Sequence, residues 1–218
     1  EMLTNIKAAI FDLDGTLIDS MWVWEKIDID YLHSKGFQMP EGFRDDIAHL
    51  SFEETAVYFK KRFNLEDSLE KIRNDWHNMA IEEYSNNVKL KRGAKEFLTL
   101  LKNNGIKIGL ATSNYDALIS IVLNKNGIRD LFDAITTTSE VSKGKDFPDV
   151  YLLAAKKLGV DPAECIVFED ILPAILGAKA AGMKVVGILD QAARHQWDEI
   201  LETADKTITD FIELSEAV

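Results

Sequence analysis

Two aspartates, Asp12 and Asp14, directly follow a short apolar stretch near the start of the chain. The apolar stretch has the length of a buried strand, and Gly15 then allows the backbone to turn sharply. In an extended strand, residues two positions apart point to the same face of the sheet. If the strand continues through Asp14, both carboxylates are therefore expected on one face. Two adjacent negative charges repel each other, and they therefore require a cation, a shared proton or a chemical task.

Two further apolar stretches end in polar residues in the same way. One ends at Thr112 and Asn114, and the other ends at Glu169 and Asp170. Because the carboxyl ends of parallel strands meet at one edge of a sheet, we expect these side chains to converge in one crevice with the two aspartates. The sequence therefore predicts a polar site at the end of a sheet.

The acidic side chains of this crevice predict a metal site. A hard divalent cation with oxygen ligands, Mg²⁺ by default, would remove their repulsion and keep water ligands that a substrate can replace. The alternative is that some of these acids cap helix N-termini, which strand-to-helix turns favour. For paired acids on two strands we favour the metal, and the candidate ligands are Asp12, Asp14, Glu169 and Asp170.

Thr112 and Lys145 are candidates for binding an anion. Thr112 precedes an expected helix, and a hydroxyl beside free N–H groups at the start of a helix can bind a phosphate. The alternative is that Thr-Ser-Asn only caps the helix, which is typical of these residues. Lys145 precedes a helix expected over about 148–158. An isolated lysine is usually a solvated surface charge, but this acidic site would need a cation to accept an anionic substrate.

Hydrophobic periodicity divides the chain into two parts. From about residue 90 onward, helical patterns alternate with short apolar strands, which implies right-handed crossovers and a parallel sheet. From about residue 19 to residue 88 the sequence has helical patterns with no convincing strand. We therefore predict an α/β protein with a doubly wound parallel-sheet core, formed by residues 1–17 and 90–218, and an inserted α-helical cap over 18–89.

The composition limits the partners and the compartment. The 218 residues carry a net charge of −12, which disfavours nucleic acid or an anionic membrane as the main partner. The single cysteine, Cys165, lies in an apolar stretch, where a buried small hydrophobe in a reducing compartment is expected. With no signal peptide and no apolar run long enough to span a bilayer, a cytoplasmic protein is expected.

Four short motifs, in this order, resemble those of the haloacid dehalogenase superfamily of phosphotransferases. They are Asp-Leu-Asp-Gly-Thr at 12–16, Ala-Thr-Ser-Asn at 111–114, Gly-Lys at 144–145 and Phe-Glu-Asp at 168–170. The helical insert after the first motif resembles a C1-type cap, and the closest likeness is to the subgroup of beta-phosphoglucomutase and small phosphatases. The resemblance implies a Rossmann-like core.

The resemblance also implies a role for each motif residue. Asp12 would be the nucleophile that forms an aspartyl-phosphate, and Asp14 would protonate the leaving oxygen and then deprotonate water. Mg²⁺ would bind to Asp12, to the backbone carbonyl of Asp14 and to Asp170, with Glu169 as a ligand or as a neighbour of one. The phosphoryl group would be held by Thr112, Ser113, Asn114 and Lys145.

Three positions of the insert depart from the mutase pattern. The mutase has a histidine where this chain has Trp24, and its glycine and phosphate-binding arginine are replaced by His49 and Phe52. Without that arginine, a second phosphate is difficult to hold. We therefore expect a Mg²⁺-dependent phosphatase that acts on a small phosphorylated metabolite, as a monomer or weak oligomer. The alternatives are a sugar-phosphate mutase and, from another class, a phospho-acceptor or binding protein without turnover.

Overall fold

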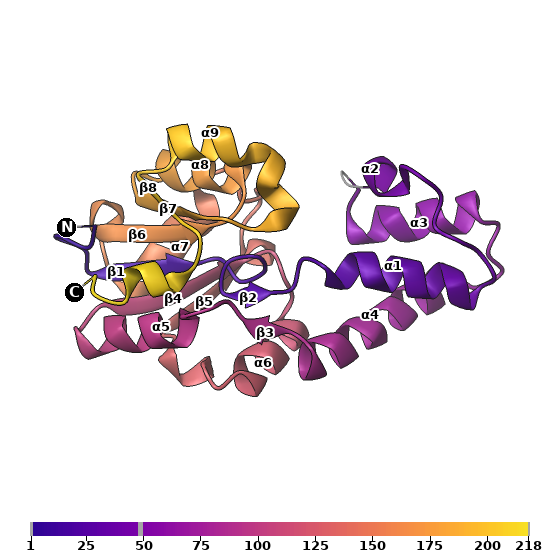
Figure 1. Cartoon of the computed structure of the whole chain (residues 1–218), viewed down its shortest axis with the longest axis horizontal. Helices are drawn as coiled ribbons and strands as arrows, with labels where there is room; N and C mark the ends of the chain where they lie inside the picture. Colours follow the sequence, from indigo (N-terminus) through magenta and orange to yellow (C-terminus); the bar gives the residue numbers. More distant parts are fainter. Residues whose placement is uncertain (1, 48–49, 218) are drawn as a thin grey trace. The chain divides into compact units, whose positions relative to one another are not determined.

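The computed structural model describes residues 2–47 and 50–217 (Figure 1). The chain folds into two compact units. The first, here called the α/β unit, comprises Glu1–Ser20 and Val88–Val218, and the second, the helical unit, comprises Met21–Asn87. The helical unit is therefore an insertion in the sequence of the α/β unit.

The α/β unit contains a sheet of six parallel strands in the order β5-β4-β1-β6-β7-β8. This arrangement confirms the predicted doubly wound sheet, with the first strand of the chain at its centre. The strands are β1 (Ala8–Phe11), β4 (Lys107–Thr112), β5 (Ala134–Thr137), β6 (Cys165–Glu169), β7 (Lys184–Ile188) and β8 (Lys206–Ile208).

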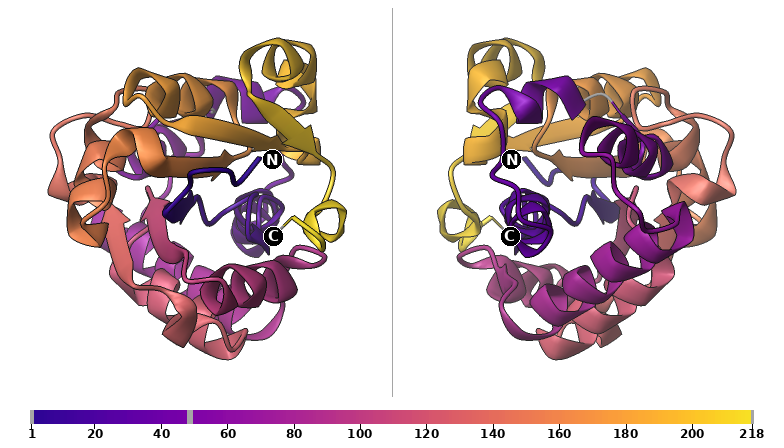
Figure 2. Two further views of the ribbon diagram at one scale, coloured as in Figure 1. Left: turned by 90° about the vertical axis from the view of Figure 1, so that its left-hand side faces the viewer. Right: turned by 90° about the vertical axis from the view of Figure 1, so that its right-hand side faces the viewer.

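Helices lie on both faces of this sheet (Figure 2). They are α5 (Ala94–Asn103), α6 (Asp116–Lys125), α7 (Asp149–Leu158), α8 (Leu172–Ala180) and α9 (Trp197–Thr203). The 3₁₀ turns are η1 (Arg129–Leu131), η2 (Thr138–Glu140), η3 (Pro162–Glu164), η4 (Gln191–Gln196) and η5 (Phe211–Leu214). Because both faces are covered, β1 and β6 are buried along their whole length instead of alternating between buried and exposed residues.

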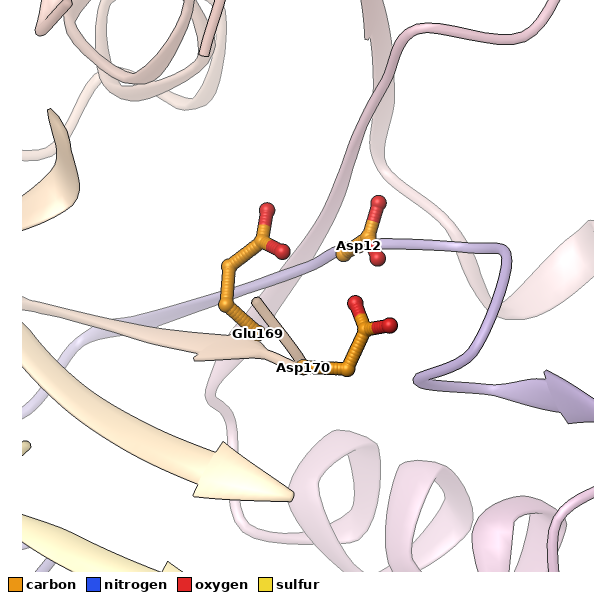
Figure 3. Close-up of side chains that lie close together, drawn as sticks. All are labelled: Asp12, Glu169 and Asp170. Atoms are coloured by element: carbon orange, nitrogen blue, oxygen red, sulfur yellow. The ribbon is translucent and has the colours of Figure 1, made fainter. Parts of the chain in front are cut away.

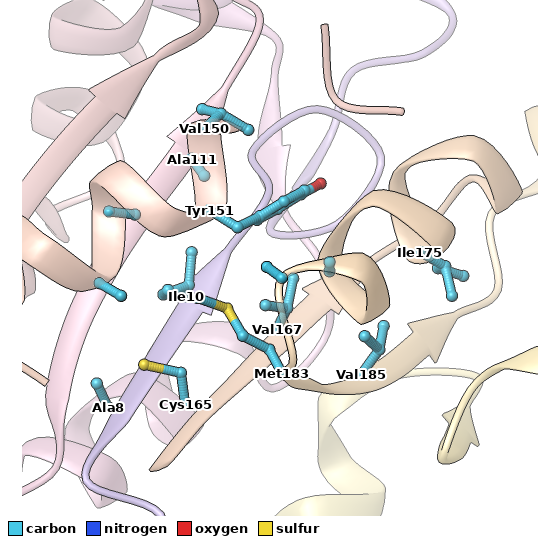
Figure 4. Close-up of a cluster of buried hydrophobic side chains, with 14 of the residues drawn as sticks. Ala8, Ile10, Ala111, Val150, Tyr151, Cys165, Val167, Ile175, Met183 and Val185 are labelled. Atoms are coloured by element: carbon cyan, nitrogen blue, oxygen red, sulfur yellow. The ribbon is translucent and has the colours of Figure 1, made fainter. Parts of the chain in front are cut away.

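Alternate residues of β1 and β6 fill two separate hydrophobic layers. Ile10 and Val167 belong to the layer that includes residues of α7 and α8 (Figure 4). On the other face Phe11 stacks on Phe168, with ring centroids 4.6 Å apart, and both pack against Phe97 of α5. The pairing of Phe11 with Phe168 fixes the register of the two strands, and that register decides which residues follow side by side.

Cys165, the first residue of β6, is fully buried in the same layer as Ile10. Burial raises the pKa of its thiol to about 11. The residue therefore behaves as the small buried hydrophobe that the sequence predicted.

The helical unit contains α1 (Val23–Ser34), α2 (Phe43–Ile47), α3 (Phe52–Arg62) and α4 (Leu69–Asn86). Its core is aromatic, because Trp76 of α4 contacts the rings of Tyr31 and Phe59 at centroid distances of 5.7 and 4.8 Å. Helix α3 begins with a capping box in which Ser51 accepts from the backbone N–H of Glu54.

A two-stranded antiparallel ribbon of the α/β unit is formed by the segments that precede and follow the helical unit in the sequence. It pairs β2 (Ile18–Asp19) with β3 (Lys89–Leu90), and Lys91 N–H also donates to the carbonyl of Leu17. Neither strand was predicted: β2 overlaps the first residue of the segment from about 19 to 88 that was expected to lack strands, and β3 directly follows its end. Strands of two residues are too short to give a period in the sequence, so periodicity could not reveal them.

Candidate active site

Three carboxylates meet at the carboxyl edge of β1 and β6. Asp12 directly follows β1, Glu169 is the last residue of β6, and Asp170 comes next. The N–H of Asp12 donates to the carbonyl of Phe168 at 3.0 Å, which continues the pairing of the two strands past the end of β1. One oxygen from each carboxylate lies within 4.8 Å of the others, and all three residues are buried (Figure 3).

Lys145 is the cation at this site. Its Nζ lies 2.5 Å from Oδ1 of Asp12 and 2.6 Å from Oε2 of Glu169. The lysine side chain is only 9% exposed, so these ion pairs are shielded from water. The lysine is therefore a buried partner of the acids and not a solvated surface charge.

Burial and the neighbouring negative charge raise the pKa values of Glu169 and Asp170. Burial raises the pKa of Glu169 to about 7, the charge of Asp12 adds to this effect, and Lys145 opposes it. Burial and the charge of Asp12 also raise the pKa of Asp170 well above its usual range. Burial alone would lower the pKa of Lys145, but the charges of Asp12 and Glu169 outweigh burial and raise it. The site therefore holds three acids and one lysine, which leaves an excess of negative charge when the acids are ionised.

Two further hydroxyl groups contact these acids. Neither belongs to a residue that was predicted from the sequence to form part of the site. Thr16 Oγ1 lies 3.1 Å from Oδ2 of Asp12 and 3.2 Å from Oδ1 of Asp170. The hydroxyl of Tyr151, from α7, donates to Oε2 of Glu169 at 2.7 Å. Thr16 could have been identified as a site residue from its place in the first motif. Tyr151 could not, because nothing in the sequence distinguishes it from an aromatic residue of the hydrophobic core.

Asp14 does not join the three-carboxylate cluster through its side chain. Strand β1 ends at Phe11, and Gly15 adopts a φ of 83°, so the chain turns before strand alternation can align the two aspartates. Ser20 Oγ donates to one oxygen of Asp14 at 2.7 Å, and Asn114 Nδ2 donates to the other at 3.0 Å. Asp14 therefore has a polar environment of its own beside the cluster.

The second motif lies at the end of β4, next to β1 in the sheet. Thr112 is buried, and its Oγ1 accepts from the N–H of Asn114 at 3.0 Å. Ser113 is exposed. The structure thus brings Asn114 to Asp14 and places Thr112 on the neighbouring strand, while Lys145 and the acids form the centre.

The residues present fit a hard divalent cation. Glu169 Oε1 is buried and has no hydrogen-bond partner among residues 2–47 and 50–217, so its oxygen lacks the donor that a buried acceptor requires. The three acids supply the all-oxygen ligands that Mg²⁺ prefers, and a divalent charge would offset the negative charge that Lys145 leaves. The composition of the site therefore matches the predicted cofactor.

Comparisons with known proteins define the class. The model of the haloacid dehalogenase-like hydrolase family matches residues 9–188, and the chain belongs to this family. It is a hydrolase of the haloacid dehalogenase type, which confirms the resemblance of the four motifs.

Individual relatives cover most of the chain. Hexitol phosphatase B of Escherichia coli K12 is 31% identical over 97% of this chain and 95% of that protein. Beta-phosphoglucomutase of Bacillus subtilis is 34% identical over 84% of this chain and 83% of that protein. The crystal structure of beta-phosphoglucomutase from Clostridium difficile superposes with a TM-score of 0.73 and 27% identity, covering 96% of this chain and 93% of that one.

None of the helices described is long and apolar enough to cross a membrane.

Proposed function

We propose that this protein is a Mg²⁺-dependent phosphatase that hydrolyses a small phosphate monoester, a sugar phosphate or a similar metabolite, through an aspartyl-phosphate on Asp12. The observation that carries the proposal is the contact of Lys145 with Asp12 inside the buried acid cluster. A carboxylate beside a fixed cation can accept a phosphoryl group while the cation stabilises the developing charge. The phosphatase and mutase names of the relatives point to phosphorylated carbohydrates as the substrate class.

In the first step an oxygen of Asp12 attacks the phosphorus atom, and the bond from phosphorus to the ester oxygen breaks. Asp14 gives its proton to that oxygen, so the alcohol leaves neutral. Lys145, already 2.5 Å from Asp12, holds an oxygen of the transferred group. Thr112, Ser113 and Asn114 contribute hydroxyl, amide and backbone donors at the end of β4.

In the second step water clears the intermediate. Asp14, now ionised, takes a proton from a water molecule as the oxygen of that water attacks phosphorus. The bond between phosphorus and the carboxylate oxygen of Asp12 then breaks, and inorganic phosphate leaves. Asp14 has the position for this work because Ser20 and Asn114 hold its carboxylate outside the acid cluster. The two aspartates of one motif thus perform different tasks.

Mg²⁺ would be held by Asp12, Glu169 and Asp170 together with the backbone carbonyl of Asp14. When bound, it would neutralise charge on the phosphoryl oxygens. Thr16 supports this arrangement, since its hydroxyl lies within reach of both Asp12 and Asp170.

Hydrolysis is favoured over mutase chemistry by two positions of the helical unit. The rings of Trp24 and Phe52 lie 5.8 Å apart, and Phe52 also contacts Trp76 at 5.8 Å. These positions therefore form an apolar aromatic contact, which offers no cation to a second phosphate. His49, the third departure from the mutase pattern, lies outside the described residues.

We also propose that residues 18–89 act as a cap that opens and closes, with hinges near 17–19 and 88–92. The two crossings between the units, at Ser20 and Val88, support the proposal because each adjoins a strand of the β2–β3 ribbon. Small-angle scattering should change on addition of Mg²⁺ and a phosphate analogue. Identical profiles would contradict the closure.

The proposed activity is tested with a panel of phosphate monoesters. Released inorganic phosphate should require Mg²⁺ and should be highest with hexitol and hexose phosphates. Beta-glucose 1-phosphate separates the two enzyme classes, because isomerisation that outpaces phosphate release would identify a mutase. A stable phospho-Asp12 without turnover would instead identify a phospho-acceptor.

A further inference from the structure

Gly177 lies in the middle of α8 and is buried. An ideal Cβ at this position would lie 1.9 Å from the carbonyl oxygen of Lys145. It would also lie 3.0 Å from the carbonyl carbon of Lys145 and from the carbonyl oxygen of Phe147. All three atoms belong to the backbone of the loop that carries Lys145, and backbone atoms cannot rotate away from a clash as a side-chain tip can.

Helix geometry does not explain the glycine. Gly177 has no positive φ, and glycine is among the poorest residues in a helix interior. The close approach of the loop does explain it, because only a residue without Cβ lets another backbone come so near.

Other glycines in the core are in a different situation. At Gly109 in β4 the nearest atom to an added Cβ would be Cδ1 of Leu158, at 2.9 Å. That atom is the end of a flexible side chain and can move. An alanine at position 109 therefore tests the effect of an added methyl group in the core without touching the loop.

Helix α8 connects the two charged parts of the active site. It begins at Leu172, two residues after Asp170, and five residues later Gly177 meets the loop of Lys145. The Nζ atom of Lys145 lies 2.5 Å from Oδ1 of Asp12 and 2.6 Å from Oε2 of Glu169. A shift of the Lys145 backbone by the width of a methyl group would disturb both distances.

We propose that Gly177 is a positioning residue for the active site: by lacking a side chain, it seats the backbone of Lys145 against α8 and so sets the lysine ammonium between Asp12 and Glu169. Of the two measurements that test this inference, only the activity measurement depends on the proposed function. Gly177 itself touches neither the substrate nor the acids.

The test is the variant Gly177→Ala, with two measurements on the folded protein. The first is the rate at which an amine-reactive acetylating reagent modifies Lys145, followed by mass spectrometry of the peptide. A lysine that is 9% exposed and ion-paired reacts slowly, and its release in the variant should accelerate the reaction severalfold. The second is kcat/KM, which should fall by about 100-fold, as expected for a displacement of about 1 Å in a catalytic group.

Two comparisons separate positioning from a merely structural effect. Gly109→Ala should leave the acetylation of Lys145 unchanged. In the background Lys145→Ala, adding Gly177→Ala should cause little further loss of kcat/KM, because the residue through which Gly177 acts is already absent.

Three results would overturn the proposal. The first is a Gly177→Ala variant with wild-type acetylation and activity, the second is an activity loss additive with that of Lys145→Ala, and the third is a variant that fails to fold, which would assign Gly177 to the fold alone. If the wild-type protein releases no phosphate from any monoester, the proposed function fails. The acetylation rates still decide the role of Gly177 in that case.

Discussion

Buried charge is balanced in the helical unit and unbalanced in the α/β unit. In the helical unit Asp28 is buried and forms an ion pair with Arg44, one acid with one cation. In the α/β unit the cluster of Asp12, Glu169 and Asp170 contains three acids, and Lys145 forms ion pairs with the first two. A balanced pair can be explained by the fold that surrounds it. An excess of buried acids raises the free energy of the folded protein unless a ligand or protons compensate it, so that excess marks the functional site.

The largest effect is expected from removing the proposed nucleophile. Asp12→Asn should lower kcat by at least about 10⁴-fold, because an amide is a poor nucleophile toward phosphorus. The fold should persist, since the substitution keeps the shape of the side chain and removes one of three repelling charges. Circular dichroism and released phosphate measure both effects. Substantial turnover by the variant would exclude the aspartyl-phosphate mechanism.

The matched control is the same substitution in the other unit. Asp28→Asn removes a buried acid of equal size from the helical unit and should retain most of the activity. If both variants lost activity equally, the contrast between the balanced and unbalanced sites would not hold.

Much of the architecture could be predicted from the sequence because its signals are local. A short apolar run followed by an acid indicates a buried strand that ends at the site, and this pattern located β1 and β6 with Asp12, Glu169 and Asp170. Alternation of such strands with helices then implied the parallel sheet that the structure contains.

The remaining features depend on contacts that form only when a turn is made or when separate elements pack together. Tyr151 reaches Glu169 from α7, and Ser20 reaches Asp14 across a turn. Gly177 meets the backbone of Lys145 only because α8 packs against that loop. No residue type or spacing encodes these meetings, since each depends on how separate elements pack. The ribbon of β2 and β3 was missed because strands of two residues are too short to show a period.

Addition of Mg²⁺ should stabilise the α/β unit by relieving its excess charge. A ligand that binds only the folded protein stabilises it by about 2.7 kcal/mol at one hundred times its Kd. We therefore expect the melting temperature to rise with Mg²⁺ and to fall back when a chelator removes it. Asp170→Asn should lose most of this increase, whereas Asp28→Asn should keep it. A melting temperature that ignores Mg²⁺ would contradict the metal site.

The pH dependence of stability should reveal the pair in the helical unit. Burial raises the pKa of Asp28 from 3.8 to about 6, and Arg44 opposes the shift. Between these values the folded protein binds more protons than the unfolded chain, so the contribution of Asp28 to stability is greatest below about pH 4 and is lost as the pH rises to about 6. The loss is about 3 kcal/mol, because one pKa unit corresponds to about 1.4 kcal/mol and the Asp28 side chain is almost fully buried.

Asp28→Asn provides the test of this assignment. The variant should unfold in urea with a flatter pH profile between pH 4 and 6 than the wild-type protein. Arg44→Met should have the opposite effect, because without its cation the buried carboxylate holds its proton to higher pH. Profiles that coincide for all three proteins would show that the ion pair does not govern stability in this range.

The smallest effect concerns two tyrosines, one in each unit. Tyr151 donates to Glu169 at 2.7 Å on the same oxygen that Lys145 contacts, which leaves Oε1 of Glu169 without a donor in the described part of the chain. Tyr31 in the helical unit has a buried hydroxyl with no hydrogen-bond partner among the described residues. One hydroxyl therefore orients an acid of the site, and the other contributes no such bond.

Replacing each tyrosine with phenylalanine removes only the hydroxyl and keeps the ring. Tyr151→Phe should weaken Mg²⁺ binding, measured by calorimetry, by about tenfold, because groups that orient a metal ligand typically contribute this much. Tyr31→Phe should leave Mg²⁺ binding unchanged and should not lower stability, since it removes a buried group that lacks a partner. Equal Mg²⁺ affinities for the two variants would mean that Lys145 alone suffices to orient Glu169.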